Sequence, residues 1–438
     1  MKTLFLRLKN GLLKLGHPAY LALFIAINIC FGIAVMHTGA FESAVQNPGY
    51  RLLYHIQLIS IILCWIATVI FVLFLYGTPL DAYLIKKGFK AINFDNAAQE
   101  VPLLVSETKR ENGLTDLLFT TSEIPLVTWQ DKKDALESVL RRKIVSISYV
   151  NNMQFILLTV TEVAELPKRI IWDSKYISRK EGVIVLGLGY TGRVEIDLSK
   201  IPHILIAGST GSGKSELVRL IIYQCIKMGA NVHLCDLKGG LDYGVYYHKM
   251  THLITTETDL KQCLINIIAE LQERKKLLQA SGCKNVSEYN KLHQGSHLAR
   301  VIVVIDEIAE VTDSTGKTKE QKQLTADIVN MLSTIARLGR AFSINLVIST
   351  QRPDANILPG QIKNNVDCRI CGRADNVLSQ IILDSTDAAE KIPKDAQGRF
   401  IMQDGSEFQA FLLTHRDEIS LAMHDELAND YYAKSQRK

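Results

Sequence analysis

The sequence after residue 90 has almost no net charge. The whole chain carries +5, and residues 1–90 hold eight Lys or Arg against Glu42 and Asp81, so the rest of the chain carries −1. A uniformly basic surface of the kind that binds nucleic acid non-specifically is therefore excluded for the bulk of the protein. Any contact with DNA has to come from a local patch.

The chain also lacks a disulfide or zinc framework. Its eight cysteines fall in apolar stretches or in the part placed in the cytosol, where thiols stay reduced. Cys368 and Cys371 have the spacing of half a zinc site, but no second CxxC or HxxxH pair follows them. Two small apolar residues in a strand are the alternative that the pattern favours.

Charged residues are absent from two long apolar stretches, residues 18–36 and 52–76. Each is close to the 20 or so residues that cross a hydrocarbon core, which predicts two transmembrane helices. A cleaved signal peptide is the alternative for the first stretch, although its apolar part is longer than usual. Lys and Arg flank the pair on both outer sides, so we expect a multi-pass cell-membrane protein with both termini cytoplasmic.

The pattern as a whole predicts four segments. Residues 1–90 form the membrane anchor, residues 91–182 mix strands and helices as a small α+β adaptor, and residues 183–415 alternate short β-rich runs with helices. This alternation is typical of an α/β fold whose parallel sheet is covered on both faces. Residues 416–438 form a hydrophilic tail.

A phosphate-binding loop stands between a predicted strand and a predicted helix. The stretch "IAGSTGSGKSE" contains Gly-x-x-x-x-Gly-Lys-Ser in the strand–loop–helix setting that the motif requires. Backbone N–H groups of the loop would surround the phosphates of ATP, and a chance glycine-rich turn is the weaker alternative. The predicted binding residues are Gly208, Ser209, Thr210, Gly211, Ser212, Gly213, Lys214 and Ser215.

Polar residues follow two later apolar runs. "RVIVVIDE" ends in Asp306 and Glu307, a pair suited to holding Mg²⁺ through water and to polarising the attacking water. "INLVISTQRP" ends near Gln351, which could sense the terminal phosphate. Arg340 precedes this run at the end of a predicted helix, either as an arginine supplied to a neighbouring subunit or as an exposed helix-end residue.

These motifs, with "IARLGRAF" and "IKNNVDCRI", resemble the motor of the FtsK/SpoIIIE family of DNA translocases within the HerA/FtsK ATPases. The resemblance covers about residues 183–415. It implies a RecA-like core, a homohexameric ring, and ATP- and Mg²⁺-dependent movement of DNA. By the same resemblance Lys214 and Ser215 bind ATP and Mg²⁺, and Asp306 and Glu307 serve hydrolysis.

The resemblance also implies that Gln351 is the sensor, Arg340 the trans-acting finger and Lys284, in "SGCKNVSEYN", a contact to DNA phosphates. An ordinary surface loop is the alternative for Lys284. The residues after the predicted motor are too few for a winged-helix domain, and with two spans the chain looks like the TcpA-like coupling proteins of conjugative elements. The implied partners are relaxase and channel proteins; the alternatives are a chromosome-segregation pump and a protein-secretion ATPase.

Overall fold

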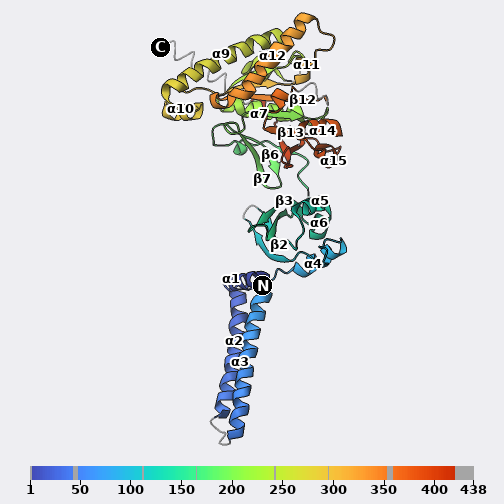
Figure 1. Ribbon diagram of the computed structural model, residues 1–438. Helices are drawn as coiled ribbons and strands as arrows, with labels where there is room; N and C mark the ends of the chain where they lie inside the picture. Colours follow the sequence, from blue (N-terminus) through green and yellow to red (C-terminus); the bar gives the residue numbers. More distant parts are fainter. Residues whose placement is uncertain are drawn as a thin grey trace. The chain divides into compact units, whose positions relative to one another are not determined.

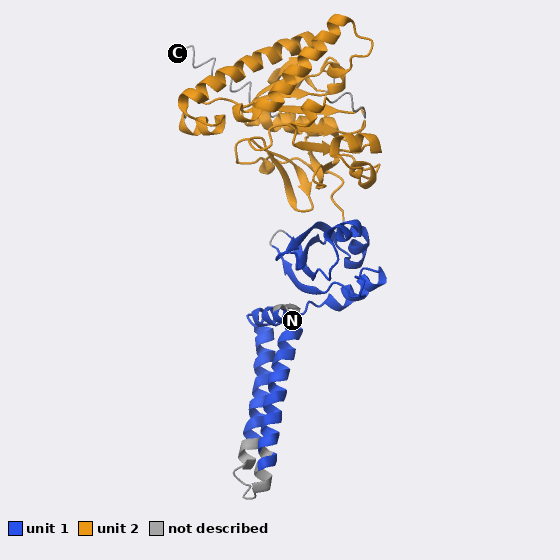
Figure 2. Cartoon of the chain, in the orientation of Figure 1, with its two compact units in different colours: residues 1–164 blue, residues 165–438 orange. Residues whose placement is uncertain are grey.

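The computed structural model describes residues 2–42, 48–110, 113–163, 165–240, 243–293, 295–352 and 359–419. The chain divides into two compact units, residues 1–164 and 165–438 (Figure 2). The predicted segment boundaries stay predictions. Most of the predicted tail, residues 420–438, lies outside the described residues.

The first unit begins with four helices, namely α1 (Lys2–Lys14), α2 (Pro18–Glu42), α3 (Pro48–Gly77) and α4 (Ala82–Ala91). Helices α2 and α3 lie side by side as a hairpin (Figure 1). Within them Pro18–His37 and His55–Gly77 are long and apolar enough to cross a membrane, by length and composition. The Trp65 indole donates to the Asn28 amide oxygen at 2.9 Å, so a polar contact joins the two helices.

A small antiparallel sheet follows in the same unit. Its strands are β1 (Leu104–Lys109), β2 (Leu114–Thr120), β3 (Lys143–Val150) and β4 (Phe155–Thr161), in the order β1-β2-β4-β3. Helices α5 (Leu126–Asp131) and α6 (Lys133–Leu140) connect β2 to β3. The core is aromatic, because Trp129 packs edge-on against Phe89 of α4 and Phe94. This mixed composition agrees with the predicted α+β character.

The described strands of the second unit form one 11-stranded sheet. The strands are β5 (Ile170–Ile171), β6 (Val183–Gly189), β7 (Gly192–Asp197), β8 (Ile204–Ala207), β9 (Asn231–Cys235), β10 (His252–Ile254), β11 (Val301–Ile305), β12 (Ile344–Thr350), β13 (Cys368–Cys371), β14 (Arg399–Met402) and β15 (Glu407–Leu412). Their order is β10-β9-β11-β12-β8-β13-β14-β15-β6-β7, and β5 pairs with β15.

The pairs from β10 to β13 are parallel, and those from β13 to β7 are antiparallel. The predicted α/β fold with a parallel sheet is therefore confirmed, with an antiparallel extension that the sequence pattern did not predict. Cys368 and Cys371 both lie buried in β13, where burial raises the pKa of each thiol to about 12.

Helices cover both faces of this sheet (Figure 1). They are α7 (Lys214–Lys227), α8 (Val245–Met250), α9 (Glu257–Ser281), α10 (Val286–Leu292), α11 (Ile308–Thr312), α12 (Lys319–Leu338), α13 (Gly360–Lys363), α14 (Asn376–Leu383) and α15 (Asp387–Lys391), with 3₁₀ turns η1 (Ser174–Tyr176) and η2 (Gly339–Phe342). Strand β11 alternates between the faces: Val303 packs in the core under α9 and α12, and Val304 in the core under α7.

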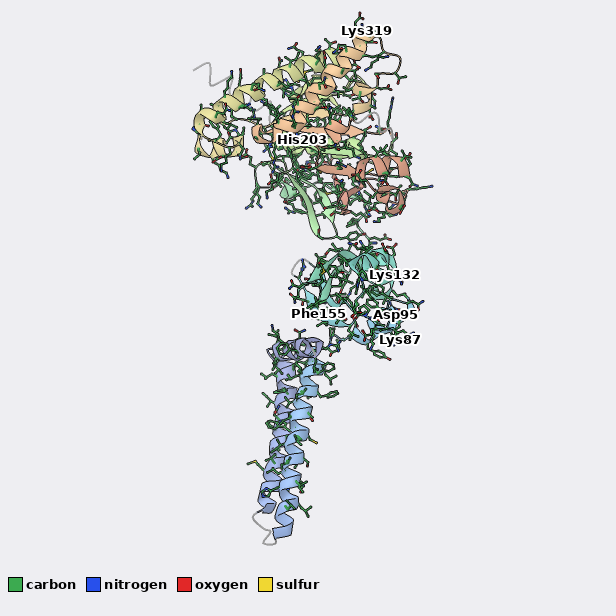
Figure 3. The ribbon with its side chains drawn as sticks, viewed as in Figure 1. Lys87, Asp95, Lys132, Phe155, His203 and Lys319 are labelled. Carbon is green, nitrogen blue, oxygen red and sulfur yellow. The ribbon has the colours of Figure 1, made fainter. Side chains whose placement is uncertain are left out.

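His203 is fully buried just before β8 (Figure 3), and its Nδ1 accepts a hydrogen bond from the Leu346 amide of β12 at 3.0 Å. Burial lowers the pKa of this imidazole to about 4, because charging it would require water that the core excludes. The folded state therefore favours neutral His203. Its contribution to stability is complete above the unfolded-state pKa of about 6.5 and declines as the pH falls toward 4.

We predict that the free energy of unfolding of the second unit falls by roughly 3 kcal/mol between pH 7 and pH 4 because of His203 alone. The His203→Gln variant keeps a hydrogen-bonding side chain but does not titrate, so its melting temperature should fall less over this pH range. Calorimetry of both proteins at several pH values measures the difference. Parallel pH profiles would contradict the prediction.

Candidate active site

The loop between β8 and α7 has the geometry of a phosphate-binding loop. Gly211 and Gly213 adopt left-handed φ angles of +76° and +96°, which side chains with a Cβ rarely adopt. A Cβ on Gly213 would also lie 2.9 Å from the backbone nitrogen of Gly398. Among the described residues, the N–H groups of Gly211, Gly213 and Lys214 donate to no protein acceptor. They lie at the N-terminus of α7, where the helix dipole favours an anion.

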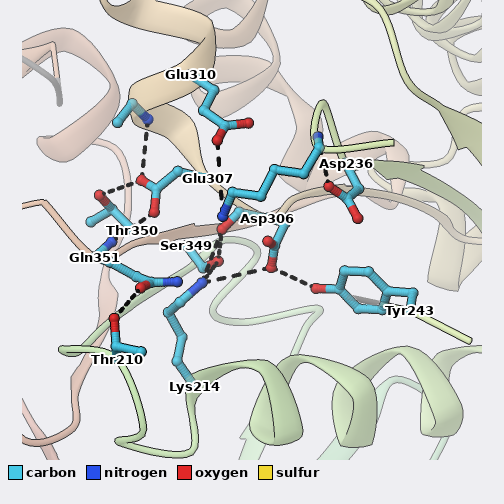
Figure 4. A network of polar contacts seen from close by, with 12 residues as sticks. Thr210, Lys214, Asp236, Tyr243, Asp306, Glu307, Glu310, Ser349, Thr350 and Gln351 are labelled. Atoms are coloured by element: carbon cyan, nitrogen blue, oxygen red, sulfur yellow. Dashed lines mark hydrogen bonds and ion pairs between the residues drawn. The ribbon is translucent and has the colours of Figure 1, made fainter. Parts of the chain in front are cut away.

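Lys214, the first residue of α7, is buried with its ammonium turned toward the ends of β11 and β12 (Figure 4). Its Nζ lies 3.1 Å from the carbonyl oxygen of Asp306 and 3.0 Å from the hydroxyl of Ser349. A carboxylate oxygen of Asp306 is 3.6 Å away. The charge of a buried lysine needs such partners, so this network compensates it.

Asp306 uses its two carboxylate oxygens differently. Oδ1 accepts a hydrogen bond from the Tyr243 hydroxyl at 2.7 Å and faces Lys214, whereas Oδ2 is buried and has no partner among the described residues. Burial, together with the charge of Asp306, raises the pKa of Tyr243 well above its ordinary value, so this hydroxyl stays a donor. One carboxylate oxygen is thus left for a further ligand.

Glu307 joins the ends of the two neighbouring strands. Its Oε1 accepts from the Thr350 hydroxyl at 2.8 Å and from the Ala309 amide at 3.3 Å, and its Oε2 accepts from the Gln351 amide at 2.9 Å (Figure 4). The Ala309 contact also caps α11. A carboxylate offers about four acceptor positions, so one remains open for water.

Gln351 connects this cluster to the phosphate loop. Its side-chain oxygen accepts from the Thr210 hydroxyl of the phosphate loop at 3.0 Å. Strands β8, β11 and β12 are parallel, so their carboxyl ends meet at one edge of the sheet. The structure therefore brings together four of the sequence-predicted residues, namely Lys214, Asp306, Glu307 and Gln351.

Known proteins are similar to this chain in sequence and in structure. The FtsK/SpoIIIE family profile matches residues 168–355. The solved structure of the pCW3 conjugation coupling protein TcpA, a monomer form with ATPγS, is 37% identical and has a TM-score of 0.58. The match covers 79% of this chain and 100% of that one. The chain belongs to the FtsK/SpoIIIE family.

Curated FtsK proteins match about half of this chain. The DNA translocase FtsK of Staphylococcus aureus is 30% identical over 240 residues, which is 51% of this chain and 29% of that protein. The DNA translocase FtsK of Campylobacter jejuni is 31% identical over 241 residues, or 52% and 24%. The chain thus spans less than a third of the length of these relatives. Membership of the family makes it a P-loop NTP hydrolase.

The residues present fit a nucleotide with a magnesium ion. The unpaired N–H groups of the FtsK/SpoIIIE phosphate loop suit phosphate oxygens, and Lys214 lies beside them. The unpaired Oδ2 of Asp306 and the Ser215 hydroxyl, which makes no hydrogen bond within the described residues, are oxygen ligands of the type that Mg²⁺ prefers. Magnesium takes few protein ligands and fills its other positions with phosphate and water.

Arg340 and Lys284 lie away from this cluster. Helix α12 ends at Leu338, so Arg340 sits in the 3₁₀ turn η2 and not at the helix end that the sequence predicted. A Cβ on Gly339 would run into the Ile344 carbonyl, and this close approach accompanies the tighter turn. Turn η2 precedes β12, so Arg340 is at the opposite edge of the sheet from Gln351. Lys284 is exposed in the turn between α9 and α10.

Sequence reasoning missed two residues of the FtsK/SpoIIIE site. Ser349 lies one residue before the polar end of β12, and a strand-end hydroxyl beside Thr350 was the available signal. Tyr243 reaches Asp306 from a segment 63 residues earlier, and nothing in its local sequence indicates that contact.

Proposed function

We propose that this chain is a membrane-anchored, ATP-driven DNA translocase that serves as the coupling protein in conjugative DNA transfer. The observation that carries the proposal is the match to TcpA, which extends over the whole of that chain and reaches 79% of this one. The cluster of Lys214, Asp306 and Glu307 supports the proposal, because such a protein needs a centre that hydrolyses ATP. Proposed partners are DNA, five further copies of the chain in a ring, a relaxase and channel proteins.

We propose that Lys214 exchanges its present partners for phosphate oxygens when nucleotide binds. Its ammonium is held by Asp306 and Ser349, both within 3.1 Å, so the charge is already desolvated and positioned before binding. Ser215 and Asp306 are the proposed holders of Mg²⁺. ATP supplies the phosphoanhydride whose hydrolysis drives movement, and Mg²⁺ offsets phosphate charge.

Glu307 is the proposed group that orients and polarises the attacking water. Three of its acceptor positions are occupied by groups of α11, of β12 and of Gln351 directly after β12, which fixes the direction of the fourth. Gln351 contacts the phosphate loop through Thr210, so it can report the state of the loop to the end of β12. We propose Gln351 as the sensor on this ground and on the family resemblance.

A segregation pump of the FtsK type remains the second candidate, favoured by the 30% identity to the Staphylococcus aureus translocase. The ATPase rate of the full-length protein with and without DNA tests the shared part of both proposals. Transfer frequency and chromosome segregation in cells carrying Lys214→Ala then separate them. Loss of transfer with normal segregation supports coupling, whereas the reverse result favours the pump. An ATPase indifferent to DNA would contradict both.

We predict that both termini lie in the cytoplasm. Lys and Arg flank both apolar spans on their outer sides, and the connection between them is nearly uncharged. In intact cells, an impermeant thiol reagent should label a cysteine engineered at Gln46, which lies outside the described residues, and none at Ser106 in β1. The background is a chain without native cysteines. Labelling at Ser106 would overturn the topology.

A further inference from the structure

The outer side of the phosphate loop is held by residues far along the chain. The Ser209 amide and hydroxyl both donate to the Arg373 carbonyl, at 2.8 and 2.9 Å. The Arg373 guanidinium in turn donates to the Thr210 carbonyl at 2.9 Å and to the Lys394 carbonyl. On the next turn of the loop, the Gly398 amide donates to the Ser212 carbonyl at 2.8 Å. Arg373 and Gly398 both lie beyond residues 168–355, which match the family profile.

These contacts determine which way two peptide planes face. In a trans peptide the carbonyl of one residue and the N–H of the next point in opposite directions. Holding the Thr210 carbonyl outward therefore turns the Gly211 N–H inward, and holding the Ser212 carbonyl outward does the same for Gly213. These two N–H groups have no protein acceptor among the described residues. Glycine at both positions would otherwise let the planes rotate.

We propose that Arg373 is a positioning residue that keeps the phosphate loop ready for nucleotide before nucleotide binds. Its guanidinium offers several donors in a rigid planar fork, which suits a bridge between the carbonyls of Thr210 and Lys394. It acts on the Gly211 peptide plane, whereas Gly398 holds the Gly213 plane without a side chain. The proposal rests on the nucleotide-binding role of the loop proposed above.

The test compares full-length wild type, Arg373→Met, Arg373→Lys and Arg369→Met. Arg369 is the matched control, since it lies in β13, four residues before Arg373, and binds the Val366 and Lys363 carbonyls and Asp384 but not the loop. Calorimetric titration with ATPγS should give a Kd on the order of tenfold weaker for Arg373→Met, the loss expected for a charged hydrogen bond. Arg373→Lys should lie between, and Arg369→Met should match wild type.

A second measurement separates positioning from direct contact with nucleotide. In the nucleotide-free protein, hydrogen exchange at the Ser212 amide, which donates to the Ser209 carbonyl, should be faster in Arg373→Met and in Arg373→Lys than in wild type. Weaker binding by Arg373→Met with unchanged hydrogen exchange would overturn the positioning role. The role would also be overturned if Arg373→Met bound ATPγS as tightly as wild type, or if Arg369→Met lost as much affinity as Arg373→Met. If Arg373→Met does not fold, Arg373→Lys decides by the same two measurements. Failure of wild type to bind ATPγS would count against the proposed function instead.

Discussion

Replacing Glu307 by Gln should give a protein that binds ATP and releases almost no product. The carboxylate lies at the end of β11, and its one open acceptor position is the proposed contact to the attacking water. An amide cannot take up a proton from water, so we expect the hydrolysis rate to fall by about 10²- to 10⁴-fold. Lys214→Ala should behave differently from Glu307→Gln, because it should no longer bind nucleotide.

The structure shows what the amide would disturb. One Glu307 oxygen becomes an NH₂ group, which cannot accept from Thr350 or from the Gln351 amide. A control for this local change is Glu310→Gln, one helical turn further on. It carries the same charge change within the same acidic cluster, and among the described residues Glu310 pairs with Lys238 and makes no hydrogen bond to β12. Retention of radiolabelled ATP and single-turnover hydrolysis are the measurements. Near-normal turnover in Glu307→Gln, or an equal loss of hydrolysis in Glu310→Gln, would contradict the role proposed for Glu307.

Arg340→Ala should bind nucleotide normally and yet hydrolyse it on the order of 10³-fold more slowly or worse, as for arginine fingers elsewhere. The seven residues of β12 separate Arg340 from the carboxyl edge, about 20 Å of strand. Arg340 therefore cannot reach the phosphate loop of its own chain. Its exposed position leaves it free to serve the site of a neighbouring copy.

Mixing two inactive variants tests that arrangement. Lys214→Ala subunits cannot use ATP but keep Arg340, whereas Arg340→Ala subunits hold ATP but lack the arginine. Mixed assemblies, verified by light scattering, should regain activity where the two kinds meet. Arg337→Ala, one turn earlier and also exposed, is the matched comparison. No recovery in mixed assemblies, or normal hydrolysis by Arg340→Ala alone, would move the finger to Arg337 or Arg352.

The local motifs of the site could be predicted because each is continuous in the chain. The phosphate loop and the pair Asp306 and Glu307 each follow an apolar run, and parallel strands bring such ends together without further information. The contacts that support these motifs join residues far apart in the sequence. Tyr243 reaches Asp306 across 63 positions, and Arg373 reaches Thr210 across 163. A single sequence has no local pattern that encodes such pairs.

The fold, like the site, could be predicted only in part. The alternation of strands and helices indicates a parallel α/β sheet, but it does not reveal that β14, β15, β6 and β7 extend the sheet in antiparallel fashion. The end of α12 was misplaced for a physical reason. Helical periodicity continues through Arg340, whereas the close approach of Gly339 to Ile344 accompanies a tighter turn two residues earlier.

Strand β8 is synthesised long before the two strands that pair with it. It pairs on one side with β12 and on the other with β13, and both are made more than 130 residues after it. At ribosomal speed this delay is roughly 10 to 30 s, during which an apolar strand has two open edges. The phosphate loop gains its flanking strands only when residue 371 has been added. The loop can make its contacts with Arg373 and Gly398 only after still more of the chain has been added.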